Sequence, residues 1–362
     1  MFDNEITSHQ NACILLLISF VFQTMLMPNI LSEVDGPVGW ISIILGSIIL
    51  ILTISPINKV MSNYENKTII GISRNLFPNY VSKIIGIYYI ILFILANSLL
   101  IKDFAEQIKY LMLFNTPIKV LIISILLTAS YAAKKGIQTI AQITHITILV
   151  ALIPYIAVII FSTYYSDYTN VFPMYPVDLY GVVNALPTIL ISFFGYSILM
   201  FSNRHVDKSE KNMVLNKRFI IISMILYIAS YVLIIIKFGI KEASHLVWPF
   251  LSIMKFVNIP GFFFESTEIV GLSLQIIITF TSICILMYFT NLAIQETFET
   301  REIGYFTLIQ IPIVYILAGL LPGMYMLYPY IKIPAYFVSA ANLLIPLIIV
   351  FWENKRRKFL SQ

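Results

Sequence analysis

Apolar residues run along this chain in long stretches that short polar segments separate. Because a helix needs about 20 apolar residues to cross the hydrocarbon core of a bilayer, each stretch of that length predicts one membrane helix. About ten such ranges occur: 10–32, 39–56, 82–104, 118–133, 138–162, 184–202, 218–237, 268–295, 305–322 and 334–352. No soluble domain, low-complexity tract or long linker separates them. Residues 1–362 are therefore predicted to form a single transmembrane domain.

The composition narrows the class of protein further. Of the 362 residues, 59% are hydrophobic and 11% are charged, whereas soluble domains carry about 25% charged residues. The mean hydropathy of +0.88 extends over the whole length. These values exclude an ordinary cytosolic enzyme, a nucleic-acid-binding protein and a disordered chain. They predict an all-α polytopic membrane protein that lies in the lipid bilayer.

The basic residues predict the orientation. If the N-terminus is cytoplasmic, 16 of the 23 Lys and Arg residues fall in cytoplasmic segments and the other seven lie at the outer side. Cytoplasmic loops are enriched in Lys and Arg, so both termini are expected in the cytoplasm, and the number of spans is expected to be even. No basic residue precedes Lys59, so the first span is expected to remain as a helix rather than to be a cleaved signal peptide.

Two of the predicted spans carry helix-disrupting residues. Pro28 lies in the first range, and Pro187 and Gly195 lie in the sixth. Proline removes a backbone donor and clashes with the carbonyl four residues earlier. The first and sixth of ten spans are the first helices of two halves, as in an inverted five-plus-five repeat that holds substrate at its two broken helices. The alternative is a pair of prolines without a functional role.

Ionisable residues in or near the spans allow two interpretations each. Lys102 and Glu106, at the outer end of the third span, either neutralise each other at the interface or form a gate that orients substrate. His145, in the fifth span, either takes part in a proton-linked process or is a neutral histidine bonded to Thr144 or to a neighbouring helix. Glu265, just before the eighth span, either stabilises the start of that helix or has a functional role.

No catalytic motif is present, so an enzyme is not expected. Cys13 and Cys284 lie in apolar stretches and are interpreted as small hydrophobic residues. The remaining histidines, His9, His205 and His245, lie at helix ends or in loops without the spacing of metal ligands. Neither a metal nor a cofactor is therefore expected.

Five short motifs resemble a known family in their order and spacing: ITSHQ at 6–10, GPVGWI at 36–41, FFGY at 193–196, WPF at 248–250 and IPGFFFE at 259–265. Together they resemble the B subunits of spore germinant receptors, the endospore germination permeases. The resemblance implies a ten-helix protein of the amino acid–polyamine–organocation superfamily with a LeuT-like fold. It also implies a location in the inner membrane of spores, partner A subunits and lipoprotein C subunits, and a small nutrient such as an amino acid as ligand.

On this basis a nutrient-sensing subunit of a germinant receptor is expected, and the alternative is a stand-alone amino-acid permease coupled to protons or sodium. A third possibility is a structural scaffold that needs no ligand. The ligand is expected between spans one, three, six and eight. The candidate ligand-binding residues are Met27, Pro28, Asn29, Asn97, Phe194, Gly195, Tyr196, Thr281 and Ser282, and the candidate gate or proton-linked residues are Lys102, Glu106, His145 and Glu265.

Overall fold

The computed structural model describes residues 5–360 except 65, 164–165, 173–177, 207–209, 256–266, 301–303 and 328–329. Glu265 therefore lies outside the described residues. Within them the regular structure is helical, apart from an isolated parallel bridge between Ile6 and Val206. The fold class predicted from the apolar pattern, an all-α membrane protein, agrees with this architecture.

The longer helices are α1 (Ser8–Asp35), α2 (Gly39–Ser62), α4 (Asn79–Leu111), α5 (Ile118–Lys134), α6 (Ile137–Ser162), α7 (Leu179–Ser192), α9 (Glu210–Ala243), α11 (Thr267–Phe298), α12 (Gly304–Leu320) and α15 (Ile345–Leu360). The shorter helices are α3 (Ile69–Leu76), α8 (Gly195–Ser202), α10 (Pro249–Met254), α13 (Met324–Leu327) and α14 (Lys332–Ser339). The 3₁₀ turns are η1 (Gly36–Val38), η2 (Tyr168–Val171) and η3 (Asn203–His205), and η5 (Ala340–Leu344) is a π-helical turn.

A capping box fixes the start of α1. The Thr7 side chain accepts a hydrogen bond from the Gln10 backbone N–H at 3.2 Å, and the Gln10 side chain accepts one from the Thr7 N–H at 3.0 Å. Two of the backbone donors that a helix start leaves unpaired are thereby satisfied. The Ile6 N–H donates to the His205 carbonyl at 2.9 Å, so the residues before α1 are attached to the segment that follows α8.

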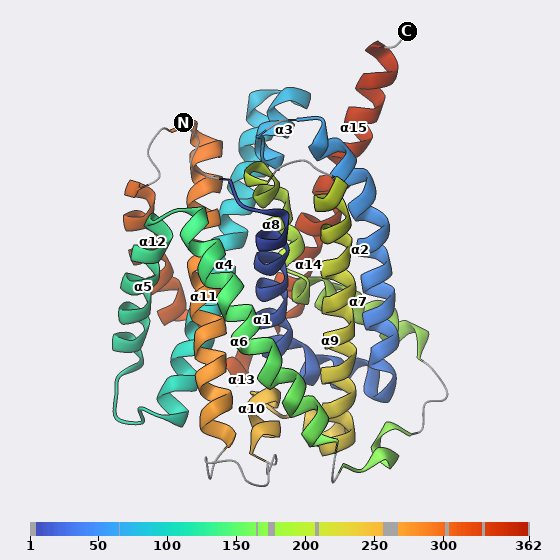
Figure 1. The fold of residues 1–362 in the computed structure, drawn as a ribbon, viewed down its shortest axis with the longest axis vertical. Coiled ribbons are helices and arrows are strands. Elements are labelled where there is room, and N and C mark those ends of the chain that lie inside the picture. Colours follow the sequence, from blue (N-terminus) through green and yellow to red (C-terminus); the bar gives the residue numbers. More distant parts are fainter. Residues whose placement is uncertain are drawn as a thin grey trace.

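Helix α1 runs through the centre of the bundle and packs on α6, α7, α8, α9 and α11 (Figure 1). Helices α4 and α11 pack along each other, and α5 and α12 cover them on the outside. Helix α14 packs on α7. The start of α1 and the end of α15 lie at the same end of the bundle, the upper end in Figure 1.

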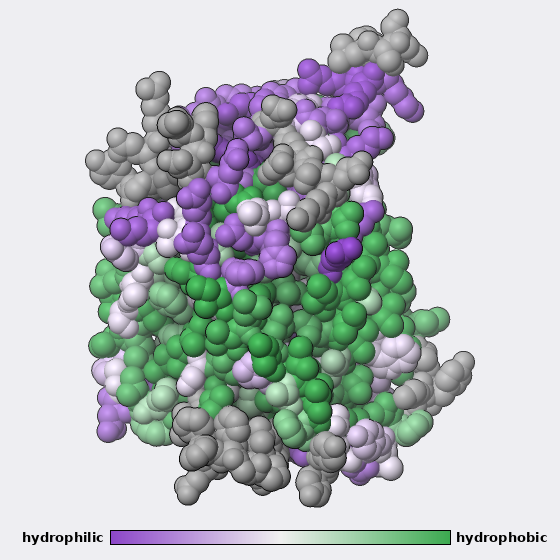
Figure 2. All heavy atoms as spheres, in the orientation of Figure 1, coloured by the Kyte–Doolittle hydropathy of each residue, from purple (hydrophilic) through white to green (hydrophobic). Residues whose placement is uncertain are grey.

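Each of the ten apolar ranges contains a helix of the structure. Six helices of the described residues are long and apolar enough to cross a membrane, and α7 with α8 would add a seventh as one bent span. On the face shown in Figure 2, hydrophobic residues form a broad band across the middle of the molecule, and hydrophilic residues gather at the upper end. Leu52 of α2, Ile84 of α4 and Ile153 of α6 are exposed, as side chains in contact with lipid would be. The protein is thus a multi-pass membrane protein.

The predicted break in the first span is wrong. Helix α1 continues without interruption from Ser8 to Asp35, so the backbone at Met27, Pro28 and Asn29 is helical. A proline removes one backbone hydrogen bond, and helices in a membrane continue past it when neighbouring groups compensate. Prolines also lie inside α2, α6, α7 and α12. The side chains at 26–30 lie outside the described residues.

Candidate ligand site

The break predicted in the sixth span is present between α7 and α8. The two helices meet at an angle of 46°, and Phe193, at the junction, has φ −90° and ψ 40°. The Tyr196 N–H bonds to the Phe193 carbonyl at 2.9 Å, and the Ser197 N–H bonds to the Phe194 carbonyl at 3.0 Å. These bonds span three residues instead of four, which tightens the first turn of α8.

Gly195 lies at a close approach between α8 and α1. A Cβ atom at this position would lie 2.2 Å from the Leu15 carbonyl oxygen and 2.5 Å from the Ser19 Oγ. Both distances are far inside van der Waals contact, so only glycine fits. The Gly195 N–H donates to the Ser19 Oγ at 3.2 Å. The glycine expected at the break is therefore required for helix packing.

Side chains from two other elements bind the carbonyl groups at the break. The Tyr227 hydroxyl of α9 lies 3.0 Å from the Ser19 carbonyl and donates also to the Ser192 carbonyl. The Asn342 amide of η5 donates to the Leu190 carbonyl at 3.0 Å, and its oxygen accepts from the Ser197 hydroxyl. The Leu190 and Ser192 carbonyls of the break are thus bonded to protein instead of being free for a ligand.

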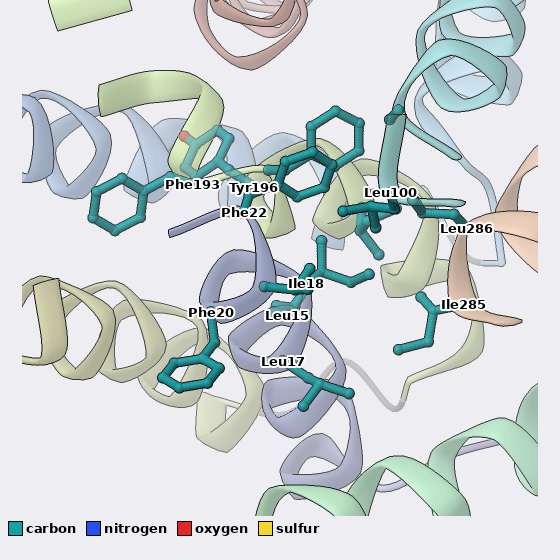
Figure 3. Packing of buried hydrophobic residues seen from close by; sticks show 14 of the residues in the cluster. Leu15, Leu17, Ile18, Phe20, Phe22, Leu100, Phe193, Tyr196, Ile285 and Leu286 are labelled. Atoms are coloured by element: carbon teal, nitrogen blue, oxygen red, sulfur yellow. The ribbon is translucent and has the colours of Figure 1, made fainter. Parts of the chain in front are cut away.

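Aromatic side chains fill the space beside the break. The rings of Phe22 and Phe194 stack with centroids 4.7 Å apart, and Phe93 of α4 lies against Phe194 at 6.1 Å. The Tyr196 hydroxyl lies 2.9 Å from the Thr53 Oγ1 of α2. Apolar side chains of α1, α4, α11 and the break meet at this point (Figure 3). Phe194, Gly195 and Tyr196 are thus brought to the centre of the molecule, in a packed arrangement.

Asn97 of α4 is fully buried, and neither its amide nitrogen nor its carbonyl oxygen has a hydrogen-bond partner. It lies one helical turn from Phe93, on the same face of α4, and Phe93 contacts Phe194 of the break. An unsatisfied buried polar group costs about 1–3 kcal/mol. Asn97 therefore offers a donor and an acceptor where the sequence predicted a ligand contact.

A polar cluster lies beside α1 at the level of Gln23. The Gln23 amide donates to the Ser230 Oγ of α9 at 3.1 Å, and the Tyr155 hydroxyl of α6 also bonds to Ser230. The Gln23 oxygen is buried and unpartnered. Gln23, Tyr155, Ser230 and Phe250 of α10 line a small cavity with room for about one water molecule.

Gln275 of α11 adds a second unpartnered oxygen near α1. Its amide lies 3.5 Å from the Thr24 Oγ1 and 3.5 Å from the Thr279 Oγ1, whereas its oxygen has no partner. Sequence reasoning did not select Gln23, Tyr155, Ser230, Gln275 or Asn342. The sequence feature that could have identified these residues is a polar side chain in the middle of an apolar stretch.

Thr281 and Ser282 do not join this cluster. The Thr281 Oγ1 lies 3.1 Å from the Thr147 Oγ1 of α6 and also donates to the carbonyl four residues earlier. The Ser282 hydroxyl donates to the Ile278 carbonyl within its own helix at 2.9 Å. In this conformation Thr281 therefore connects two helices, and Ser282 bonds within α11.

The charged cluster at the lower end of α4 is buried inside the protein. The Lys102 Nζ lies 3.5 Å from the Glu106 Oε1, and both side chains are about nine-tenths buried. The Glu106 Oε2 accepts a hydrogen bond from the Met324 N–H of α13 at 3.0 Å. The Trp248 Nε1 donates to the Asp103 Oδ1 at 2.9 Å. These contacts join α4 to α13 and to the start of α10.

Ion pairs connect the elements at the upper end. Arg204, just after α8, pairs with Glu296 in the last turn of α11. Arg74 of α3 donates to the Glu296 backbone carbonyl and lies 3.2 Å from the Glu299 carboxylate. Nearby, burial and a hydrogen bond to Glu353 raise the pKa of Tyr64 to about 12. The segment after α8 is therefore linked to α3 and α11.

His145 lies against α1 and not against Thr144. Its Nδ1 is 3.7 Å from the Cys13 Sγ, whereas the Thr144 hydroxyl donates to the Ile140 carbonyl of its own helix. A neighbouring helix is therefore its partner, as one of the two interpretations of this residue expected.

Comparison with known proteins identifies relatives along nearly the whole chain. A family model described as spore germination protein matches residues 5–322. Spore germination protein A2 of Bacillus subtilis is 26% identical over 288 residues, which cover 78% of this chain and 79% of that protein. Spore germination protein YndE of the same organism is 23% identical over 98% of this chain and 99% of its own length. Spore germination protein GerQB of Bacillus cereus is 20% identical over 76% of this chain and 75% of its own length.

Proposed function

Because the chain belongs to the family of spore germination proteins, we propose that it is the nutrient-sensing membrane subunit of a spore germinant receptor. In this proposal the chain crosses the spore inner membrane ten times, with a LeuT-like arrangement of two five-helix repeats and both termini in the cytoplasm. The ligand is an amino-acid-like nutrient, and it binds between α1, α4, α8 and α11.

The proposal rests on one observation, the close packing of the break between α7 and α8. The break is packed, and Tyr227 and Asn342 bind its carbonyls. A ligand can reach the break only if these contacts exchange. Binding of the ligand is then coupled to the packing of α8 against α1, α9 and η5. A ligand with different affinities for two conformations of the protein shifts the populations of these conformations.

Three buried polar side chains, on α1, α4 and α11, lack hydrogen-bond partners that a charged, hydrogen-bonding ligand could supply. Asn97 lacks partners at both polar atoms, and Gln23 and Gln275 lack partners at their oxygens. Ammonium and carboxylate groups of an amino-acid-like ligand supply the missing donors and acceptors. Each hydrogen bond formed removes the penalty of an unsatisfied buried group.

The signal leaves the protein at its upper end. Arg204 follows α8 directly and pairs with Glu296 of α11, beside Arg74 of α3. Movement of α8 displaces this ion pair and with it the segments 57–83 and 203–218. We assign these segments to contacts with the receptor A subunit, and a lipoprotein C subunit completes the assembly.

The test is an Asn97→Leu variant that replaces the native gene in spores. Removal of an unsatisfied polar group from an apolar core leaves the stability of the protein unchanged or higher. Loss of a ligand hydrogen bond raises the nutrient concentration needed for germination by about tenfold or more. The measurements are germination against the concentration of single amino acids and the thermal stability of the purified variant.

Asn291→Leu is the matched control, because Asn291 is equally buried but bonded to Thr307 and Gln310. We expect Asn291→Leu to lower the thermal stability of the protein. In spores that retain the protein, the nutrient concentration needed for germination should stay unchanged. Deletion of the gene is expected to abolish germination by one class of nutrient, while germination triggered downstream of the receptors continues. Wild-type sensitivity in Asn97→Leu spores would contradict the assigned site.

The permease alternative rests on the buried charges of α4, because intramembrane ionisable residues often mark ion pathways. Lys102, Asp103 and Glu106 would then carry the coupling ion. Deletion spores that germinate normally with every nutrient, in a strain that fails to accumulate an amino acid during growth, would establish this alternative and exclude the sensor.

A further inference from the structure

Three metal-ligating side chains meet where the start of α1 lies against α6. His9 and Cys13 lie one turn apart at the start of α1, and His145 comes from α6. One ligand atom from each residue lies within 4.8 Å of the other two. The sequence did not reveal this group, because His145 follows Cys13 by 132 residues.

The two sulfur–nitrogen distances fit the tetrahedral coordination of a small cation. The Cys13 Sγ is 3.7 Å from the His9 Nδ1 and 3.7 Å from the His145 Nδ1. Zinc bonds of about 2.3 Å to sulfur and about 2.05 Å to nitrogen place these atoms about 3.6 Å apart at the tetrahedral angle. The two imidazole rings are inclined at 71°, with centroids 5.2 Å apart, so their nitrogen atoms converge without stacking.

The Cys13 sulfur faces both imidazole rings, with a distance of 3.7 Å to the Nδ1 atom of each. A cation bound to the thiolate accepts electron pairs from both nitrogens at once. The donor set of one sulfur and two imidazole nitrogens, without a carboxylate, selects Zn²⁺ over Mg²⁺ or Ca²⁺.

The three residues differ in solvent exposure, which leaves a path for a cation from solution to the Cys13 sulfur. His9 is exposed, His145 is half-buried and Cys13 is 7% exposed. A cation from solution meets His9 first and then reaches the sulfur. A water molecule can occupy the fourth tetrahedral position on the exposed side.

We propose that His9, Cys13 and His145 bind Zn²⁺ and thereby tie the first turns of α1 to α6. On binding, the Cys13 thiol releases its proton to solvent as the zinc–sulfur bond forms. Because α1 packs on most of the helices around it, the cation holds the central helix of the bundle at its upper end. This site is separate from the nutrient site, and its existence does not depend on the proposed function.

The test uses Co²⁺ as a spectroscopic probe on the full chain, purified in detergent by a tag without histidine. We expect one Co²⁺ per chain, with a thiolate-to-cobalt charge-transfer band in the near ultraviolet and the visible absorption of tetrahedral Co²⁺. Addition of Zn²⁺ removes both signals. Zn²⁺ also raises the melting temperature, because it binds the folded protein.

Three variants and two controls locate the ligands. Cys13→Ser loses the charge-transfer band, and His9→Ala and His145→Ala each lose the tetrahedral visible absorption. Cys284→Ser, which changes the other buried cysteine, and His245→Ala, which changes an exposed histidine, retain both signals. The absence of a thiolate band in the wild-type protein, or its persistence in Cys13→Ser, overturns the proposal.

Discussion

Gly195 is the residue with the least freedom to change. We expect Gly195→Ala to destabilise the folded protein, since its Cβ atom would lie 2.2 Å from the Leu15 carbonyl oxygen, a backbone atom that cannot rotate away. Overpacking of this kind costs about 1–3 kcal/mol. The measurement is the melting temperature of the purified variant, which should fall by several degrees.

Gly319→Ala provides the comparison, because no heavy atom lies within 4 Å of a Cβ atom built at Gly319. Near the end of α12 this change should leave the melting temperature equal or slightly higher, as alanine favours helix. Equal melting temperatures for Gly195→Ala and the wild-type protein would show that α8 and α1 are not in close contact.

The sequence identified the position of Gly195 correctly but not its partners. A glycine in the middle of an apolar run indicates close backbone approach, and this pattern placed the break near 195. The same reasoning could not name Ser19, Tyr227 or Asn342, which hold the break. These partners come from three elements far apart in the chain, and the face that each helix turns toward the break is not encoded in hydropathy.

At the scale of helices, a break in a helix requires hydrogen-bond partners for the freed backbone groups as well as a helix-disrupting residue. Pro28 does not interrupt α1. The α7–α8 break has Tyr227 to bind the Ser192 carbonyl and Ser19 to bind the Gly195 N–H. In an apolar interior each unpaired backbone group is costly. The tertiary hydrogen bonds therefore determine which of two disrupted sequences opens, and a single sequence does not show them.

We expect Tyr227→Phe to loosen the break, since the Ser192 carbonyl then loses its donor. Hydrogen exchange of the backbone amides at 193–198 should become faster, and the effect should be local because the ring remains in place. Tyr231→Phe, one turn further along α9, removes a hydroxyl that bonds to the Gly36 carbonyl at the lower end instead. Unchanged exchange at 193–198 in Tyr227→Phe would show that Tyr227 does not hold the break.

For the whole molecule, the start of α1 and the end of α15 lie at one end of the bundle (Figure 1), and the basic residues predict that this end is cytoplasmic. A cysteine at position 170, in η2 at the lower end, should react with a membrane-impermeant reagent from outside the cell. A cysteine at position 210, at the start of α9, should react only from the cytoplasmic side. Both substitutions are made in a chain with Cys13 and Cys284 changed to serine. Labelling with the opposite sidedness would reverse the orientation that we propose.

Much of the architecture follows from hydropathy, because lipid requires long apolar helices and excludes most charges from them. Hydropathy correctly located a helix in every predicted range. It did not predict that Lys102 and Glu106 are buried inside the protein, because their burial depends on the contact of α4 with α13. The zinc-ligand group and the polar cluster of Gln23 and Ser230 were not predicted for the same reason, as each requires knowledge of which helices are neighbours.

The central position of α1 has a consequence for synthesis of the protein. Ser230 follows Gln23 by 207 residues, and Gln275 follows Thr24 by 251 residues. At roughly 5–20 residues per second, the ribosome needs about 10–50 s to make these partners after it has made α1. During that interval the polar side chains of α1 face lipid or the insertion machinery without their final bonds. We therefore expect α1 to enter the bundle late, although it is made before the helices that carry its partners.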